Sequence, residues 1–298
     1  MAWAVALALV VPASARAGSV EEAALRALLA DPRLRGASAG ALVADLWTGE
    51  TLAAHEPERV LVPASNQKIL TSVAALEHWG PTHRFATPLY AAGVTDGVVD
   101  GPLWVEGHGD PSLVSERLWS LAEELRLRGV RAIPDGIAID ASFFGGAAQH
   151  PDWYPLSQRA YEAPTAAFAA NYSTFRVEVS PANAPGGLAR LEIAPRADYF
   201  QARAEARTVP GLGRLMLGIT QLADASGERV YTSGSVAANS APDSFWRSVA
   251  LPERYAASVL RLQLEAQGIH VGPGLQFGAR PPEDPELLSF PGAPLSEL

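Results

Sequence analysis

The sequence predicts an α+β fold with a β-rich middle region. Of its 298 residues, 48% are hydrophobic and 18% are charged, which is enough apolar material for one large or two smaller domains and excludes a disordered chain. Apolar residues recur at helical spacing near both ends, whereas residues 85–245 are mainly short strand-like segments broken by Gly, Pro and Asp. We therefore expect three parts, at 18–84, 85–245 and 246–298, after a leader at 1–17.

Composition excludes several functional classes. A formal net charge of −9, with 32 acidic and 23 basic residues and no stripe of lysine or arginine, argues against nucleic acid as a partner. The absence of cysteine excludes disulfides, thiolate metal sites and a cysteine nucleophile, and none of the six histidines forms an H-x-x-x-H pair. We expect neither a metal nor a cofactor.

The amino terminus resembles a secretory signal. Residues 2–11 form an uncharged apolar run that is too short to cross a bilayer as a helix, and small-residue cleavage sites follow at 13–15 and 15–17. These features predict a signal peptide at 1–17, export to a bacterial periplasm and no stable membrane span. No positive charge precedes the run, so a buried helix is the alternative interpretation.

Local signals give the elements of the first part in order. Apolar spacing predicts a short amphipathic helix over residues 20–34, which ends near a proline. Residues 37–46 are rich in small and apolar side chains, 47–50 are typical of a turn, and 51–55 resume an extended pattern, so this segment predicts a β-hairpin. A further helix is expected to begin close to Ser65 and to stop at Gly80.

For the rest of the chain the sequence predicts short strands and two helices. Helices are expected over 118–128 and from about 253 to Gly268, which would act as the C-terminal cap. After Pro294 we expect the opening turn of another helix, which is cut off at Leu298. The strand-like segments are 87–94, 101–113, 136–146, 175–181, 188–195 and 269–277.

Lys68 is the only lysine in a chain with 22 arginines, and Ser65 lies three residues before it. At this spacing on a helix the two side chains share one face, with Cβ atoms about 5–6 Å apart. A lysine amine can lose its proton and then act as the base that a serine nucleophile requires, whereas an arginine cannot. The free N–H groups at a helix start favour the developing alkoxide.

A second interpretation of this pair stays open. Ser65 can be a helix N-cap and Lys68 a solvated cation. If the pair is catalytic, a low-dielectric wall should lower the pKa of the lysine. We expect the side chains that form this wall to be buried: Ile69, Leu70, Val73 and Leu76.

Several blocks of sequence occur in a characteristic order. The central block is Pro-Ala-Ser-Asn-Gln-Lys at 63–68, and the others are 43–52, 56–59, 107–113, 139–144, 150–153, 161–164, 171–172 and 293–298. No single block is decisive, but their order and spacing together are specific. They resemble one family, the serine D-Ala-D-Ala carboxypeptidases and DD-endopeptidases, which are low-molecular-weight class C penicillin-binding proteins (peptidase family S13), and the likeness covers roughly residues 20–298.

The resemblance implies an α+β, transpeptidase/β-lactamase-like serine hydrolase domain, split by an inserted β-rich domain. Ser65 would be the acylated nucleophile and Lys68 its general base. Asp140 matches an aspartate of the inserted domain that can recognise the free amino end of the peptidoglycan stem side chain, although an aspartate that closes a strand is as often a turn-former. His108 and Asp110, in the Gly-x-Gly-Asp-Pro loop, are expected to be structural.

Two motifs that the family requires are missing from the chain. It contains no Ser-x-Asn triplet, and without a second lysine it cannot contain Lys-Thr-Gly. We therefore expect a catalytic domain that is incomplete, truncated before both motifs, and an impaired activity of this chain.

The function expected from these observations is hydrolysis of peptidoglycan stem peptides and cross-links through an acyl-enzyme. The expected ligands are stem peptides that end in D-Ala-D-Ala and β-lactams. Two alternatives remain: a β-lactamase or esterase that shares the Ser-Lys pair, and a non-catalytic peptidoglycan-binding module.

Overall fold

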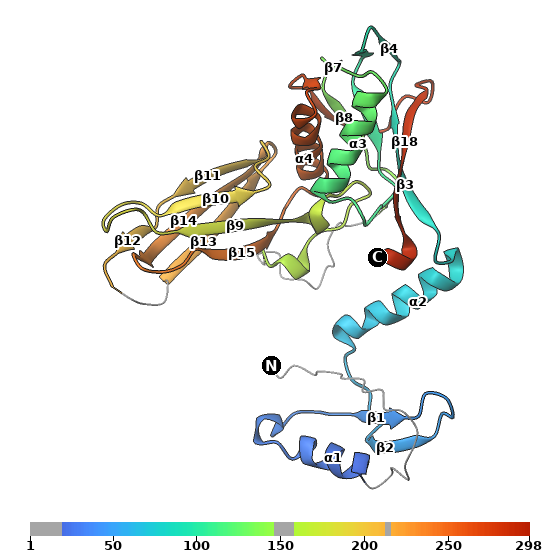
Figure 1. Ribbon diagram of the computed structural model, residues 1–298, viewed down its shortest axis with the longest axis vertical. Helices are drawn as coiled ribbons and strands as arrows, with labels where there is room; N and C mark the ends of the chain where they lie inside the picture. Colours follow the sequence, from blue (N-terminus) through green and yellow to red (C-terminus); the bar gives the residue numbers. More distant parts are fainter. Residues whose placement is uncertain (1–19, 146–157, 212–215) are drawn as a thin grey trace. The chain divides into compact units, whose positions relative to one another are not determined.

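The computed structural model describes residues 20–145, 158–211 and 216–298, which fall into two compact units (Figure 1). The first unit runs to Gly80, and the second extends from Pro81 to Leu298. The predicted signal at 1–17 lies outside the described residues. None of the described helices is both long and apolar enough to cross a membrane.

The first unit contains the predicted hairpin and both predicted helices. Strands β1 and β2 pair antiparallel, with Val43 opposite Ala53. The bounds are α1 Val20–Leu29, η1 Pro32–Leu34, β1 Ala41–Ala44, β2 Thr51–His55, η2 Ala64–Asn66 and α2 Gln67–Trp79.

One carboxylate organises the turn of this hairpin. Asp45 Oδ1 accepts hydrogen bonds from the backbone N–H of Thr48 at 2.7 Å, from the Thr48 hydroxyl at 2.9 Å and from Trp47 N–H at 2.9 Å. The bonds from Thr48 hold the pKa of Asp45 below its usual range. Gly49 has a φ of +73°, a backbone conformation that glycine adopts without a steric penalty.

The second unit begins with β3 Arg84–Tyr90, β4 Gly93–Thr95, β5 Val98–Asp100, β6 Leu103–Glu106, α3 Ser115–Leu127, β7 Ala132–Ile133, β8 Ile137–Asp140, η3 Ala160–Glu162 and η4 Asn171–Ser173. These are followed by β9 Thr174–Ser180, β10 Arg190–Ala194, β11 Phe200–Ala204, β12 Arg207–Val209, β13 Met216–Asp224, β14 Gly227–Ala237 and β15 Asp243–Ser248. The last are α4 Pro252–Ala266, β16 His270–Val271, β17 Leu275–Phe277, β18 Glu286–Pro294 and η5 Leu295–Glu297.

The described strands of this unit form four β-sheets. Their strand orders are β17-β8-β6-β3-β18, β16-β7-β5-β4, β10-β9-β15 and β11-β14-β12, with β13 also paired to β14.

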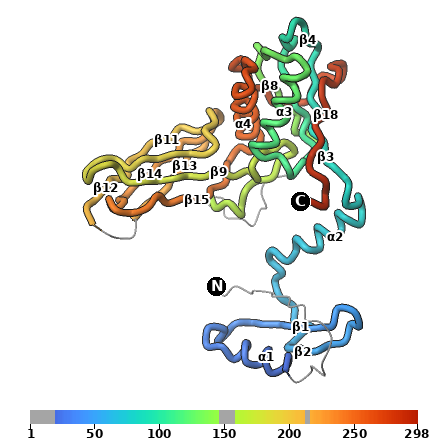
Figure 2. The backbone as a smooth tube through the Cα atoms, in the orientation of Figure 1, coloured from blue at the N-terminus to red at the C-terminus, as the bar shows by residue number. Residues whose placement is uncertain are grey.

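Helices α3 and α4 lie side by side in the second unit (Figure 2) and supply much of its core. Each buries the apolar stripe that its helical spacing predicts. The two helices, the five-stranded sheet and the strands around β9 and β14 share one hydrophobic cluster. The buried helix residues include Leu118, Leu121, Leu125, Tyr255, Val259, Leu260 and Leu264.

The last part of the chain packs within this same unit. Strand β18 pairs antiparallel with β3, so residues 246–298 and the β-rich region 85–245 belong to one compact unit. The structure has a single 3-10 turn, η5, where the opening of a helix was expected after Pro294.

A buried polar network fixes the start of α4. Glu228 is only 3% exposed and accepts hydrogen bonds from the Tyr199 hydroxyl at 2.8 Å, from Gln221 Nε2 at 2.8 Å and from the backbone N–H of Ala250 at 2.6 Å. The Tyr199 oxygen in turn accepts from the N–H of Leu251 at 3.1 Å. Burial raises the pKa of Tyr199, so the hydroxyl keeps its proton and remains a donor.

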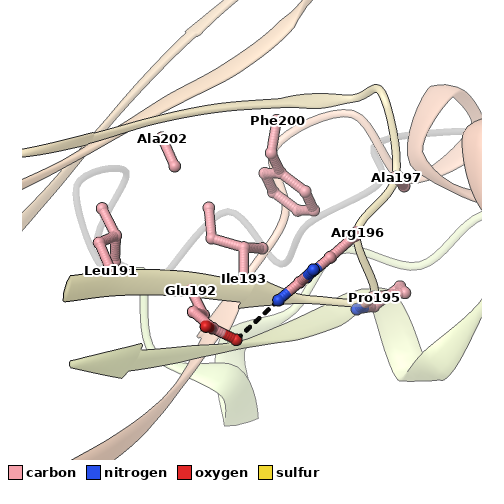
Figure 3. Close-up of a pocket in the computed structure, with 8 residues that line it drawn as sticks. All are labelled: Leu191, Glu192, Ile193, Pro195, Arg196, Ala197, Phe200 and Ala202. Carbon is pink, nitrogen blue, oxygen red and sulfur yellow. Dashed lines mark hydrogen bonds and ion pairs between the residues drawn. The ribbon is translucent and has the colours of Figure 1, made fainter. Parts of the chain in front are cut away.

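A cavity of about 420 Å³ lies between β10 and β11 (Figure 3). Its walls include Ile193 and Phe200, and an ion pair of 2.9 Å between Glu192 and Arg196 lies at its edge. None of the predicted site residues lines it.

Candidate active site

Ser65 and Lys68 lie together where α2 begins. Ser65 is in the 3-10 turn η2, Lys68 is in the first turn of α2, and Lys68 Nζ is 3.2 Å from Ser65 Oγ. The preceding residue, Ala64, has a φ of +46°, in the left-handed region that non-glycine residues rarely occupy. Backbone strain of this kind is common at functional sites.

The N-cap interpretation of Ser65 finds no support at this helix start. The N-cap residue of α2 is Asn66, and it makes no side-chain cap hydrogen bond. Ser65 Oγ instead accepts a hydrogen bond from Lys68 Nζ. The serine hydroxyl is therefore arranged toward the amine rather than toward the helix backbone.

The apolar wall expected beside Lys68 is not formed, so this prediction is wrong. Within the described part of the chain α2 buries no residue. A helix face is buried only when another element packs on it, and the first unit has only Ala53 as a described buried hydrophobic side chain. The four side chains are exposed: Ile69 63%, Leu70 63%, Val73 53% and Leu76 39%.

Asp140 ends strand β8 in the second unit and is 8% exposed. Its Oδ1 accepts from the N–H of Ser142 at 3.0 Å, and its Oδ2 accepts from the N–H of Arg280 at 2.9 Å. Burial opposes ionisation, but the hydrogen bonds from Ser142 and Arg280 hold the pKa of Asp140 below its usual range. The hydrogen bond from Ser142 N–H to Asp140 is typical of an aspartate that forms a turn. The ionised carboxylate of Asp140 still has free lone pairs that could accept from a ligand.

The sequence analysis did not identify two neighbours of Asp140, which are Glu106 and Arg280. Glu106 ends the parallel strand β6 directly opposite Asp140, and its Oε2 accepts from Arg280 Nε at 3.0 Å. Its Oε1 lies 3.0 Å from His108 Nε2. Burial opposes the charge of Glu106, but hydrogen bonds from His108 and Arg280 hold its pKa below the usual range. The available signal for Glu106 was that it directly follows the apolar run 103–105, as Asp140 follows the apolar run 137–139.

The Gly-x-Gly-Asp-Pro loop is held by Asp110, which is 5% exposed. Its Oδ1 accepts from the backbone N–H and the hydroxyl of Ser112 at 2.8 and 2.6 Å, and the hydroxyl accepts from the N–H of Ala293 at 3.0 Å. Asp110 thus ties the loop to β18, which is the structural role expected for it. The described His, Asp and Glu residues form no group of three that could hold a metal ion.

Comparison with solved structures identifies a shared fold. The structure is similar to penicillin-binding protein 4 (dacB) from Haemophilus influenzae, with a TM-score of 0.71 and 22% identity, over 87% of this chain and 57% of that one. A complex of that protein with a β-lactam matches with a TM-score of 0.63 and 20% identity, over 86% and 55% of the two chains. The predicted α+β, transpeptidase-like fold is confirmed.

Sequence comparison gives the family. A D-alanyl-D-alanine carboxypeptidase from Actinomadura sp. (strain R39) is 32% identical over 284 residues, which are 91% of this chain and 52% of that protein. The carboxypeptidase DacB of H. influenzae is 23% identical over 265 residues, 88% of this chain and 55% of the relative. The chain thus spans about half the length of these relatives. The family model described as D-Ala-D-Ala carboxypeptidase 3 (S13) matches residues 21–298, and the chain therefore belongs to this family.

Proposed function

We propose that the protein is a serine-type D-Ala-D-Ala carboxypeptidase and endopeptidase that is acylated at Ser65. The observation that carries the proposal is the 3.2 Å distance between Ser65 Oγ and Lys68 Nζ at the start of α2. This distance allows direct proton transfer between the two groups. The membership of the carboxypeptidase family supports the same chemistry.

In the proposed reaction a neutral Lys68 amine takes the proton of Ser65, and Oγ attacks the carbonyl carbon of the penultimate D-Ala. The peptide bond breaks, the terminal D-Ala leaves with a proton, and an ester to Ser65 remains. Water then hydrolyses this ester and restores the serine. Cleavage of a cross-link follows the same steps with a different leaving amine, and a β-lactam would acylate the same oxygen.

We further propose that this chain alone is impaired, because the Ser-x-Asn and Lys-Thr-Gly motifs of the family are not in it. The Lys-Thr-Gly strand frames the oxyanion hole in such enzymes. Loss of a single oxyanion donor lowers the rate by about 10²–10³-fold. The exposed flank of α2 supports this proposal, because the amine of Lys68 lies beside no buried apolar wall in the described residues.

Asp140 is proposed to bind the free amine of the stem side chain, and the protein is proposed to act in the periplasm after export through residues 1–17. The low exposure of Asp140 and its two backbone donors support the first assignment, since they fix an ionised carboxylate in place. The apolar run and the cleavage sites at the amino terminus support the second.

Covalent labelling with a fluorescent penicillin tests the nucleophile, in this chain and in a full-length protein, by which we mean this chain extended to include the Ser-x-Asn and Lys-Thr-Gly motifs of the family. We expect label on Ser65 in the full-length protein, none in Ser65→Ala, and weak label in the chain. Ser72→Ala is the matched control, because Ser72 is an exposed serine of the same helix and should not alter labelling. Label that persists in Ser65→Ala would contradict the assignment.

Two measurements separate the alternatives. Release of terminal D-Ala from a stem peptide, compared with deacylation of a β-lactam, distinguishes a carboxypeptidase from a β-lactamase. If neither Ser65→Ala nor the parent is acylated and both bind muropeptides equally well, the protein is a binding module.

A further inference from the structure

Two carboxylates end neighbouring parallel strands in the second unit. Glu106 is the last residue of β6, Asp140 is the last residue of β8, and the two are partners in the strand register. Neighbouring strands lie about 4.8 Å apart, so two anions here repel each other unless a cation lies close by. Ligands of open α/β sheets bind at this carboxyl edge of parallel strands.

Arg280 is the cation at this edge, and its contacts are divided unequally. Its side chain donates from Nε to Glu106 Oε2 at 3.0 Å, and its guanidinium carbon lies 3.8 Å from the centre of the Tyr90 ring. In the described part of the chain, its hydrogen bond to Asp140 comes from the backbone N–H. Arg280 therefore holds both carboxylates, but its guanidinium is directed to Glu106.

This division leaves one negative charge without a matching cation. The charges of Glu106 and Arg280 offset each other, and the other oxygen of Glu106 meets His108. The donors to Asp140 are the hydroxyl and N–H of Ser142 and the N–H of Arg280, which stabilise an anion but carry no net charge. The charge of Arg280 acts on Asp140 through space, but in the described residues the guanidinium makes its ion pair with Glu106, so two carboxylates share one arginine and Asp140 is the one without a side-chain ion pair.

We infer that Glu106 is a specificity-determining residue, which holds the guanidinium of Arg280 in an ion pair and so leaves the Asp140 carboxylate open to the amine of a stem peptide. This inference rests on the proposed function, since it concerns the same amine site. Without the negative charge of Glu106, the guanidinium and the ligand amine would compete for one carboxylate. Removing an anion at position 106 would then weaken cation binding, and removing the arginine as well would restore it.

The test compares two substrates of the full-length protein: a stem peptide that ends in D-Ala-D-Ala with a free side-chain amine, and the same peptide with that amine acetylated. The preference is measured in KM, because the amine lies far from the reacting bond. We expect Glu106→Gln to lower the preference for the free amine about tenfold, the scale of one charge-assisted hydrogen bond. Glu106→Gln with Arg280→Gln should recover it. Glu192→Gln, in an exposed ion pair of the same unit, is the control and should change nothing.

The outcomes for the two claims differ. If Asp140→Asn keeps the preference for the amine, the proposed role of Asp140 is wrong. If Asp140→Asn loses it but Glu106→Gln keeps it, or if the double variant stays as low as Glu106→Gln, the role of Glu106 is wrong and that of Asp140 stands.

A second measurement does not depend on any substrate. Carboxyl ¹³C titration of the chain described here reports the pKa of Asp140 directly. We expect this pKa to fall in Glu106→Gln, because the guanidinium becomes free to neutralise Asp140, and to return toward the parent value in the double variant. An unchanged pKa in Glu106→Gln would overturn the inference.

Discussion

Replacing Glu228 by glutamine tests whether the buried network at the start of α4 stabilises the second unit. The substitution keeps the size of the side chain and exchanges one acceptor oxygen for an NH₂ donor. In the parent both carboxylate oxygens of Glu228 accept from buried donors, and Ala250 N–H, at the N-terminal end of α4, is one of them. The change therefore alters hydrogen bonding and charge but leaves the packing volume alone.

The magnitude follows from the donors that surround the side chain. If the new NH₂ takes the place of Oε2, it meets the NH₂ of Gln221, and if it takes the place of Oε1, it meets the Tyr199 hydroxyl and Ala250 N–H. Gln221 could turn its amide, but it would then lose its 3.0 Å bond to the carbonyl of Ser248. Each arrangement leaves at least one buried donor unpaired, at about 1–3 kcal/mol. The anion also loses its interaction with the helix start, about 0.3–1 kcal/mol.

We therefore expect Glu228→Gln to lower the free energy of unfolding of the second unit by about 1–4 kcal/mol. For a unit of this size that corresponds to a fall in Tm of about 3–16 °C. Urea and thermal unfolding followed by circular dichroism measure both quantities. Tyr199→Phe completes a double-mutant cycle, in which the two changes should be strongly non-additive.

Glu192→Gln serves as the matched control, because Glu192 is 58% exposed and pairs with Arg196 at the surface. Exposed pairs of this kind contribute about 0–1 kcal/mol. If Glu228→Gln were as stable as this control, the network would not hold α4, and the reasoning from unpaired donors would be refuted.

Three further results are expected. Lys68→Arg in the full-length protein should slow acylation by penicillin at least about 10²-fold although it preserves the charge, because a guanidinium does not accept a proton; normal acylation would make Lys68 a surface cation. The folded pKa of Asp45 is lowered by its bonds from Thr48, so its contribution to hairpin stability is complete above the unfolded value of about 3.9 and is lost as the pH falls through the folded pKa. Hydrogen exchange at Thr48 N–H should accelerate there, and a rate that follows only the intrinsic chemistry would contradict this. Limited proteolysis should cut within 55–80 and spare α4 and β18, which are packed into the core of the second unit; equal protection of both regions would show that α2 is stable by itself.

The predictions of the hairpin and of the second helix in the first unit depended on neighbours along the chain and were confirmed. The hairpin within 37–55 and the helix that ends at Gly80 lie where turn and cap signals placed them. The i, i+3 spacing of Ser65 and Lys68 brings the two groups to 3.2 Å, because that distance is a property of one helical turn. Proximity within a single element needs no knowledge of the rest of the fold.

Strand β18 shows why a local signal can also mislead. Pro291, Gly292 and Pro294 are residues typical of turns, and no strand was predicted over 286–294. The segment is nevertheless the edge strand of the five-stranded sheet, and its register shifts between Pro291 and Pro294. Proline is tolerated there, because an edge strand has one side on which its N–H groups need no partner strand.

Burial and long-range pairing could be read only from the folded chain. The spacing of Ile69, Leu70 and Val73 marks an apolar helix face, yet these side chains are exposed in this structure, because a face is buried only when a second element packs on it. Glu106 and Arg280 are 174 positions apart, and their contact depends on the parallel alignment of β6, β8 and β17. Spacing along the chain thus identified the Ser65–Lys68 pair, while the charge arrangement around Asp140 arises from strand pairing, in which each contact joins residues whose separation in sequence carries no signal.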